Sequence, residues 1–183
     1  MKMVPAWLKI QKLSLLFYLA TGVLLLIYAL GFISDVYIFY AFGSRELIEF
    51  YESMQKVNDA LLWKAVFVII FTVVLLMLEL AKHPAGLITL LIVIIIAAVS
   101  IFICANSFIV LAQARYDYTA LDLSSLDRYI ERGAITYNYS TLIYDLGLGG
   151  YALFLLSSLF MAITVTLNAF KVHKTVVNEK EGK

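Results

Sequence analysis

The side chains that could carry chemistry in this 183-residue chain are few and scattered. Histidine occurs only at His83 and His173, and the single cysteine is Cys104. Paired haem ligands within the membrane, an intrachain disulfide and a CxxC redox centre are therefore not expected. The motifs of phosphate-binding loops, zinc proteases and serine hydrolases are also absent. We predict no cofactor, no metal site and no catalytic residue.

Two other patterns could suggest chemistry. Acidic and basic side chains cluster between residues 115 and 145, and an enzymatic site would have to be built from Asp117, Asp122, Asp127 and Arg128. The run DLGLGGY at residues 145–151 resembles a glycine-rich loop only in composition. Because an apolar stretch follows it, small-residue helix packing is the better interpretation than phosphate binding.

Composition determines the class of protein. Hydrophobic residues make up 63% of the chain and charged residues 15%, and the mean hydropathy is +0.92. A chain of this size has too little polar surface to cover such an interior in water. We therefore predict an all-α integral membrane protein, a single domain over residues 1–183 whose first partner is the lipid bilayer. Nucleic acid is not an expected partner.

Four apolar stretches match the roughly 20 helical residues that cross a bilayer. The second stretch is the weakest, because only the 14 residues between Lys64 and Glu79 are uncharged, and it needs the long side chains at its ends to reach the headgroups. The predicted spans of this four-helix bundle are about 13–34, 60–81, 85–114 and 146–170.

The charges are distributed unequally about these spans. The tails 1–12 and 171–183, with the turn between spans two and three, carry eight lysines against three glutamates, counting Glu79. The loops 35–59 and 115–145, with Lys64, carry six basic residues against ten acidic ones. Since lysine and arginine near span ends are retained in the cytoplasm, both termini are predicted to be cytoplasmic in a multi-pass protein of the cell membrane.

Both outer loops are predicted to be ordered. In the first, residues 35–43 are rich in β-branched and aromatic residues, and Ser44 can cap a helix that follows. In the second, Ser124 or Ser125 can cap a short helix ended by Gly133. Residues 135–143 then alternate in polarity, so one strand from each loop could pair in a small β-sheet.

Tyrosines are concentrated in these loops. Those that flank spans fit an aromatic belt at headgroup depth. Tyr129, Tyr137 and Tyr139 are further along the second loop, and they are our candidates for a partner-binding surface because tyrosine is enriched at protein interfaces.

Two polar side chains within or beside the spans are candidate intramembrane sites, Asn106 and Glu79. For Asn106 an interhelical hydrogen bond is favoured over a ligand-binding or pore-lining role. Glu79 is expected to pair with Lys82 or Lys12. Small residues repeat along spans three and four and predict close helix packing. They are Ala98, Ala105, Ala112, Gly150, Ser158 and Ala162.

Three functional hypotheses follow. The first is a non-catalytic subunit or accessory protein of a larger membrane complex, with the outer loops as its recognition surface. The second is a component of an oligomeric channel or transporter, and the third a membrane enzyme with a loop-borne site. The expected partner is another membrane protein or further copies of this chain.

Overall fold

Four long helices form the body of the protein. The computed structural model describes residues 6–34, 36–78, 80 and 85–181, with side chains up to residue 171. Each long helix is long and apolar enough to cross a membrane, which confirms the predicted four-span, all-α bundle. These helices are α1 (Ala6–Gly31), α3 (Arg45–Met77), α4 (Leu87–Ala120) and α6 (Leu142–Glu181).

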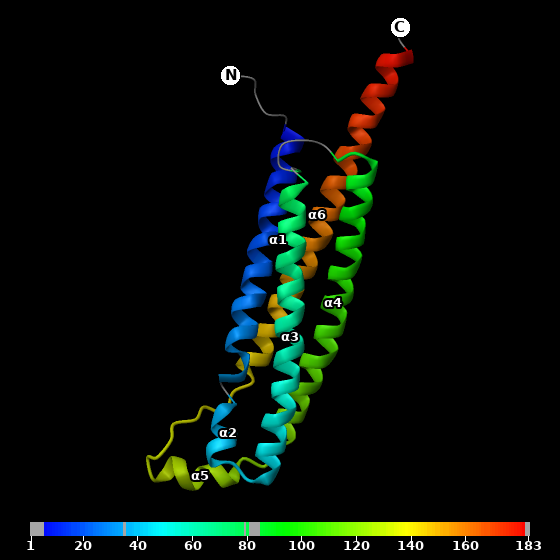
Figure 1. Ribbon diagram of the computed structural model, residues 1–183. Helices are drawn as coiled ribbons and strands as arrows, with labels where there is room; N and C mark the ends of the chain where they lie inside the picture. Colours follow the sequence, from blue (N-terminus) through cyan, green and yellow to red (C-terminus); the bar gives the residue numbers. More distant parts are fainter. Residues whose placement is uncertain (1–5, 35, 79, 81–84, 182–183) are drawn as a thin grey trace.

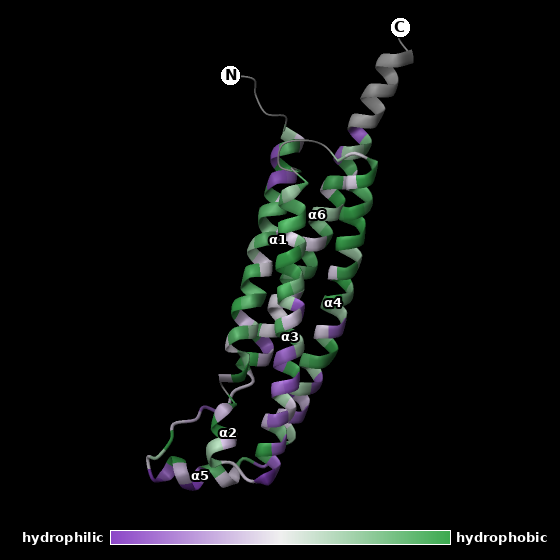
Figure 2. Cartoon of the chain, viewed as in Figure 1, coloured by the Kyte–Doolittle hydropathy of each residue, from purple (hydrophilic) through white to green (hydrophobic). Residues whose placement is uncertain are grey.

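The short elements gather at one end of the bundle. They are η1 (Phe32–Ser34), α2 (Tyr37–Phe42) and α5 (Ser124–Glu131). Figure 1 shows α2 and α5 at the end opposite both termini. We call α2, α5, the segment 132–141 and the adjoining ends of α3 and α4 the cap. Hydrophobic residues dominate the middle of the bundle and hydrophilic ones are more frequent in the cap (Figure 2).

The helices do not contact one another equally. α6 packs along both α1 and α4, and α3 packs mainly along α1. Contact between α3 and α4 is much less extensive. The α3–α4 seam is therefore the most loosely packed edge of the four-helix bundle.

One continuous helix replaces the separate loop helix and second span expected at residues 45–81. Ser44 is the N-cap of α3, and its side chain accepts a hydrogen bond from the Leu47 amide at 3.5 Å, which confirms the predicted start. Leu47, Met54 and Leu61, each seven residues apart, are buried and form an apolar stripe that continues from the cap into the bundle. Because no glycine or proline interrupts it, the helix runs on to Met77.

The predicted β-sheet is wrong, since the described residues contain no strand. Residues 37–42 form α2, which buries Phe39 completely. Without a partner, residues 135–141 stay a loop, although Ile135 and Tyr137 are half-buried and Thr136 is exposed as the alternation suggested. β-branched and aromatic residues favour a strand only where a neighbouring strand is available.

The N-terminus of the short helix in the second loop, α5, also differs from the prediction. Leu123 is its N-cap residue and makes no side-chain capping bond, so neither Ser124 nor Ser125 has the predicted role. The Asp122 carboxylate accepts a hydrogen bond from the amide of Ser124, the first helical residue, at 3.0 Å. The chain leaves α5 through Gly133, whose φ of 65° lies in the left-handed region that glycine favours.

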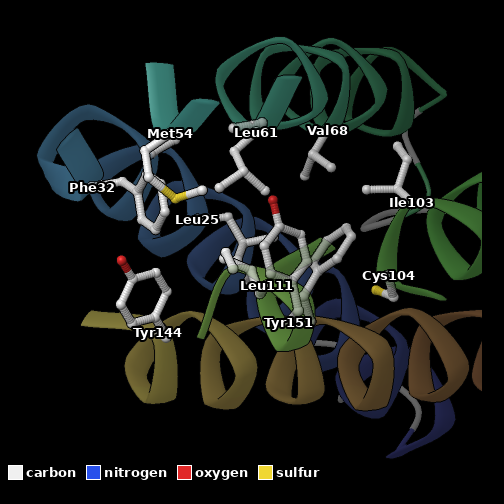
Figure 3. Close-up of a cluster of buried hydrophobic side chains, with 14 of the residues drawn as sticks. Leu25, Phe32, Met54, Leu61, Val68, Ile103, Cys104, Leu111, Tyr144 and Tyr151 are labelled. Carbon is white, nitrogen blue, oxygen red and sulfur yellow. The ribbon is translucent and has the colours of Figure 1, made fainter. Parts of the chain in front are cut away.

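Close helix contacts inside the bundle depend on glycine. A Cβ at Gly22 of α1 would lie 2.8 Å from Val68 Cγ1 of α3. A Cβ at Gly147 of α6 would overlap the Tyr28 hydroxyl of α1. Between these contacts the core is filled by large apolar side chains, with Leu25 among those drawn in Figure 3.

We expect Gly22→Leu to destabilise the bundle, because the larger side chain must displace Val68. Overpacking of this kind costs about 1–3 kcal/mol and lowers the melting temperature in detergent. Gly149→Leu is the matched control, since nothing lies within 4 Å of a Cβ at that position of α6. Equal melting of the two variants would contradict the close α1–α3 approach.

Candidate functional site

An aromatic cluster holds the cap together. Its centre is Phe39 of α2, whose ring centroid lies 6.0 Å from that of Phe50 in α3, 6.3 Å from Tyr118 in α4 and 5.4 Å from Tyr137. Separations of 4.5–7 Å are those of favourable aromatic pairs. One buried ring thus joins three segments that are distant in the sequence.

Of the three candidate tyrosines, Tyr137 belongs to this cluster. Its hydroxyl shares a hydrogen bond with the Tyr118 hydroxyl at 2.9 Å, and either can be the donor. Its ring also packs against Phe39. The structure therefore gives Tyr137 an internal packing contact.

The other two candidates keep more exposed surface. Tyr129 of α5 is 37% exposed, and its ring centroid lies 5.3 Å from that of Phe42. Tyr139 is 49% exposed and donates a hydrogen bond to the Asp127 carboxylate. That hydrogen bond is the main reason that the pKa of Tyr139 is raised to about 12. Each ring is held on one side and open on another.

A shallow pocket of about 400 Å³ lies beside Tyr129, between the α2–α3 junction and α5. Of the loop residues named as a potential enzymatic site, Arg128 lines it, whereas Asp127 bonds Tyr139 and Asp117 accepts a hydrogen bond from Gln113 at 2.7 Å. No group of three potential metal-binding side chains occurs among the residues that the structure describes. The pocket is lined by Phe42, Gly43, Ser44, Ser124, Ser125, Arg128 and Tyr129.

An ion pair joins the two helices that lead out of the cap. Arg115 Nε of α4 lies 2.8 Å from Asp145 Oδ1 of α6. Thr141 donates a hydrogen bond to the other oxygen of Asp145, also at 2.8 Å. The hydrogen bond from Thr141, followed by Arg115, lowers the pKa of the Asp145 carboxyl below its usual value. Because both partners are partly exposed, the pair contributes orientation more than stability.

Within the bundle, side-chain hydroxyls form hydrogen bonds between helices. Ser14 pairs with Thr164 at 2.7 Å and Thr21 with Ser157 at 2.8 Å, both between α1 and α6. Tyr18 of α1 pairs with Ser100 of α4 at 2.9 Å. These six residues, which we call the hydroxyl ladder, are all buried, so each pair satisfies polar groups where lipid offers no alternative partner.

At the terminal end, two amides continue this pattern. Gln11 Nε2 donates to the Leu80 carbonyl at 2.6 Å, and Asn168 Nδ2 donates to Gln11 Oε1 at 2.9 Å. Asn168 also donates to the Trp7 carbonyl at 3.1 Å. The amides thereby fasten Leu80, in the connection between α3 and α4, to α1 and α6.

Sequence reasoning missed these polar residues, although a signal was present. Positions 11, 14, 18 and 21 of α1 are spaced by three and four residues, which places them on one helical face. The apolar stretch was counted from residue 13, and serine and threonine do not interrupt such a stretch. A test for polar residues at helical spacing would have found them.

The predicted intramembrane and helix-packing residues differ in their environments. Asn106 Oδ1 accepts a hydrogen bond from Lys64 Nζ across the α3–α4 seam at 2.6 Å. Glu79 lies outside the described residues. Ser158 is buried and donates to the Phe154 carbonyl, while Gly150 and Ala162 of α6 are half-buried.

The alanine row has an unexpected position. Ala98, Ala105 and Ala112 are all exposed on the surface of α4. Any close packing that this row provides is therefore with a helix outside this chain. That role stays a prediction.

A double-mutant cycle tests the hydroxyl ladder. We expect Thr21→Val and Ser157→Ala to be non-additive, because each removes the same interhelical hydrogen bond. The coupling should be about 0.6 kcal/mol, the average for such bonds in a membrane bundle. Denaturant unfolding in mixed micelles measures it. The control cycle combines Thr21→Val with Ser53→Ala, because Ser53 is an exposed position in the cap, and its effects should be additive. If the effects are additive in both cycles, the hydrogen bond between Thr21 and Ser157 does not contribute to stability.

Comparison of the chain with protein-family models, with curated proteins and with solved structures finds no match. Two features remain as candidate sites, namely the exposed tyrosines of the cap and the Lys64–Asn106 pair between α3 and α4.

Proposed function

We propose that this protein is a non-catalytic subunit or accessory protein of a larger membrane complex, and that the cap is its recognition surface. The observation that carries the proposal is the arrangement of Tyr129 and Tyr139. Each has one side fixed within the cap, by Phe42 and Asp127 respectively, and a substantial exposed fraction. Fixed aromatic side chains with polar hydroxyls are effective protein-binding groups.

The construction of the cap supports this role energetically. A binding surface that is already ordered loses less conformational entropy when a partner binds. The Phe39 cluster joins α2 and the segment 132–141 to α3 and α4. The Arg115–Asp145 pair joins α4 to α6. The pocket beside Tyr129 supplies a concave feature into which a partner side chain can insert.

In this proposal the cap faces away from the cytoplasm. Support for this orientation is the excess of lysine in the two tails and the excess of acidic residues in the loops. A partner would be met at the outer surface of the cell membrane, and the acidic loops would favour one with basic groups there.

A channel or transporter component is the second candidate, and the buried polar residues of the bundle are the observation that favours it. The hydroxyl ladder would then line a path. In the present arrangement its hydroxyls are hydrogen-bonded to one another, so a path requires the helices to separate. The accessory role needs no such rearrangement.

Replacing the exposed tyrosines tests the accessory role. We expect Tyr129→Ser with Tyr139→Ser to lower the yield of a stoichiometric partner in mild detergent by about tenfold or more, since two interface tyrosines are removed. Tyr40→Ser is the control, because Tyr40 is similarly exposed but flanks the first predicted span, where an aromatic belt residue is expected. The melting temperature should be nearly unchanged in both.

Tyr137 is excluded from this test because its loss would disturb the Phe39 cluster. If the double variant keeps every partner at wild-type yield while it remains folded, the tyrosines are belt residues and the recognition role is wrong.

A further inference from the structure

Lys64 occupies an unusual position in the bundle. It is half-buried on α3, and its ammonium group donates a hydrogen bond of 2.6 Å to Asn106 of α4. Asn106 is exposed. The pair therefore bridges the α3–α4 seam, the most loosely packed edge of the bundle, and is accessible from outside it.

The depth of this pair follows from helix geometry. Asn106 precedes Arg115 by nine residues on α4. At 1.5 Å per residue it lies about 14 Å along the helix from the Arg115–Asp145 ion pair. If that ion pair marks the edge of a hydrocarbon layer about 30 Å thick, Lys64 and Asn106 lie well inside the layer, deeper than the headgroup level predicted for Lys64 from the sequence.

The nearest acidic residue along α3 is Asp59, five positions before Lys64 and about 140° around the helix from it. Residues 60–78 of α3 and 87–116 of α4 contain no aspartate or glutamate, and neither do residues 13–34 or 146–170. Among the described residues, no acidic side chain forms an ion pair with Lys64. An ammonium group has three donors and a full charge, and one neutral amide oxygen satisfies only part of this requirement.

The surface beside Asn106 suits another helix. One row of exposed positions on α4 has spacings of four and three residues in turn, and from Ile95 onward its larger side chains alternate with alanines. Phe102 and Ile109, on either side of Ala105, are 71% and 70% exposed. A seven-residue repeat of this kind fits left-handed packing against a second helix, and the small residues allow close approach. The row is Leu91, Ile95, Ala98, Phe102, Ala105, Ile109 and Ala112.

We propose that this face of α3 and α4 docks a transmembrane helix of a partner protein, and that an aspartate or glutamate of that helix pairs with Lys64. Charge complementarity is the argument, since a cation at this depth needs an anionic partner from outside the chain. The inference rests on the proposed function and adds a contact within the membrane to the one at the cap.

Two other occupants fit this face less well. A second copy in the same orientation, related by a two-fold axis along the membrane normal, would place its own Lys64 at the same depth. The two cations would repel, and no span of either copy offers an acid. The phosphate of a lipid lies at the headgroup level, about 14 Å from the pair by the same helix geometry.

Synthetic peptides can test the docking site without a known partner. Full-length protein is reconstituted in phosphatidylcholine vesicles with a 24-residue Leu/Ala transmembrane peptide that carries one central Glu, Gln or Leu. A central position lies level with Lys64 in either orientation of the peptide. Energy transfer between labelled protein and peptide reports association.

We expect the Glu peptide to associate about tenfold more tightly than the Leu peptide, with the Gln peptide between them. Lys64→Met should remove the preference for Glu, and Lys64→Arg should retain it. Ala105→Phe should weaken association of every peptide by blocking close approach. Unchanged melting of the variants shows that the fold persists.

Equal association of the three peptides, or a preference for Glu that survives Lys64→Met, would overturn the proposal. Energy transfer between labelled copies of the protein would also overturn the proposal if Ala105→Phe abolishes that transfer. The face would then be a site of self-association. The cap tyrosines take no part, so Tyr129→Ser with Tyr139→Ser should bind the peptides normally. Failure of this test would therefore leave the recognition role of the cap to be judged separately.

Discussion

Polar groups inside a bilayer have to find their hydrogen-bond partners within the protein, and this constraint organises the bundle. Lipid tails are as apolar as leucine, so burial of apolar side chains does not by itself hold helices together. The helices are instead joined by close packing and by hydroxyl and amide contacts. α1 is central to these contacts, because Thr21 reaches α6, Tyr18 reaches α4 and Gln11 reaches the connection at Leu80. α3 approaches α1 closely at Gly22.

The same constraint explains why the Lys64–Asn106 pair is exceptional. The hydroxyl ladder, Gln11 and Asn168 are buried inside the bundle. At the α3–α4 seam, a charged and an amide side chain meet on the outer surface. The cap is held differently, by aromatic packing around Phe39. Because α3 and α4 pass continuously from bundle to cap, the two parts are rigidly connected.

Apolar stretches and charge breaks predicted the four long helices, because hydrocarbon thickness imposes a minimum length that the sequence shows directly. Ser44 was predictable as an N-cap because capping is local. The β-sheet was predicted wrongly, since the alternation at residues 135–143 indicates one buried side of a segment and not the presence of a pairing strand. Tyr137 was a surface candidate because its sequence position says nothing of Phe39, about a hundred residues earlier.

The intramembrane contacts were only partly predictable. Asn106 is conspicuous in an apolar span, but its partner Lys64 is 42 residues away on another helix. The alanine row predicted close packing without showing its direction, and the structure places it on the outside of α4. Serine and threonine of the hydroxyl ladder were overlooked because they fit an apolar helix whether or not they bond across it.

The central claim is that an ordered cap is displayed outside the cell by a membrane-embedded bundle. Impermeant maleimide labelling of single cysteines tests it most directly, with Cys104→Ser as the background. Glu52→Cys and Asp122→Cys lie on exposed cap positions, and Lys9→Cys lies at the terminal end. The account predicts labelling at both cap positions in intact cells and at Lys9→Cys only after lysis. Labelling of Lys9→Cys in intact cells, with the cap positions reacting only after lysis, would contradict it.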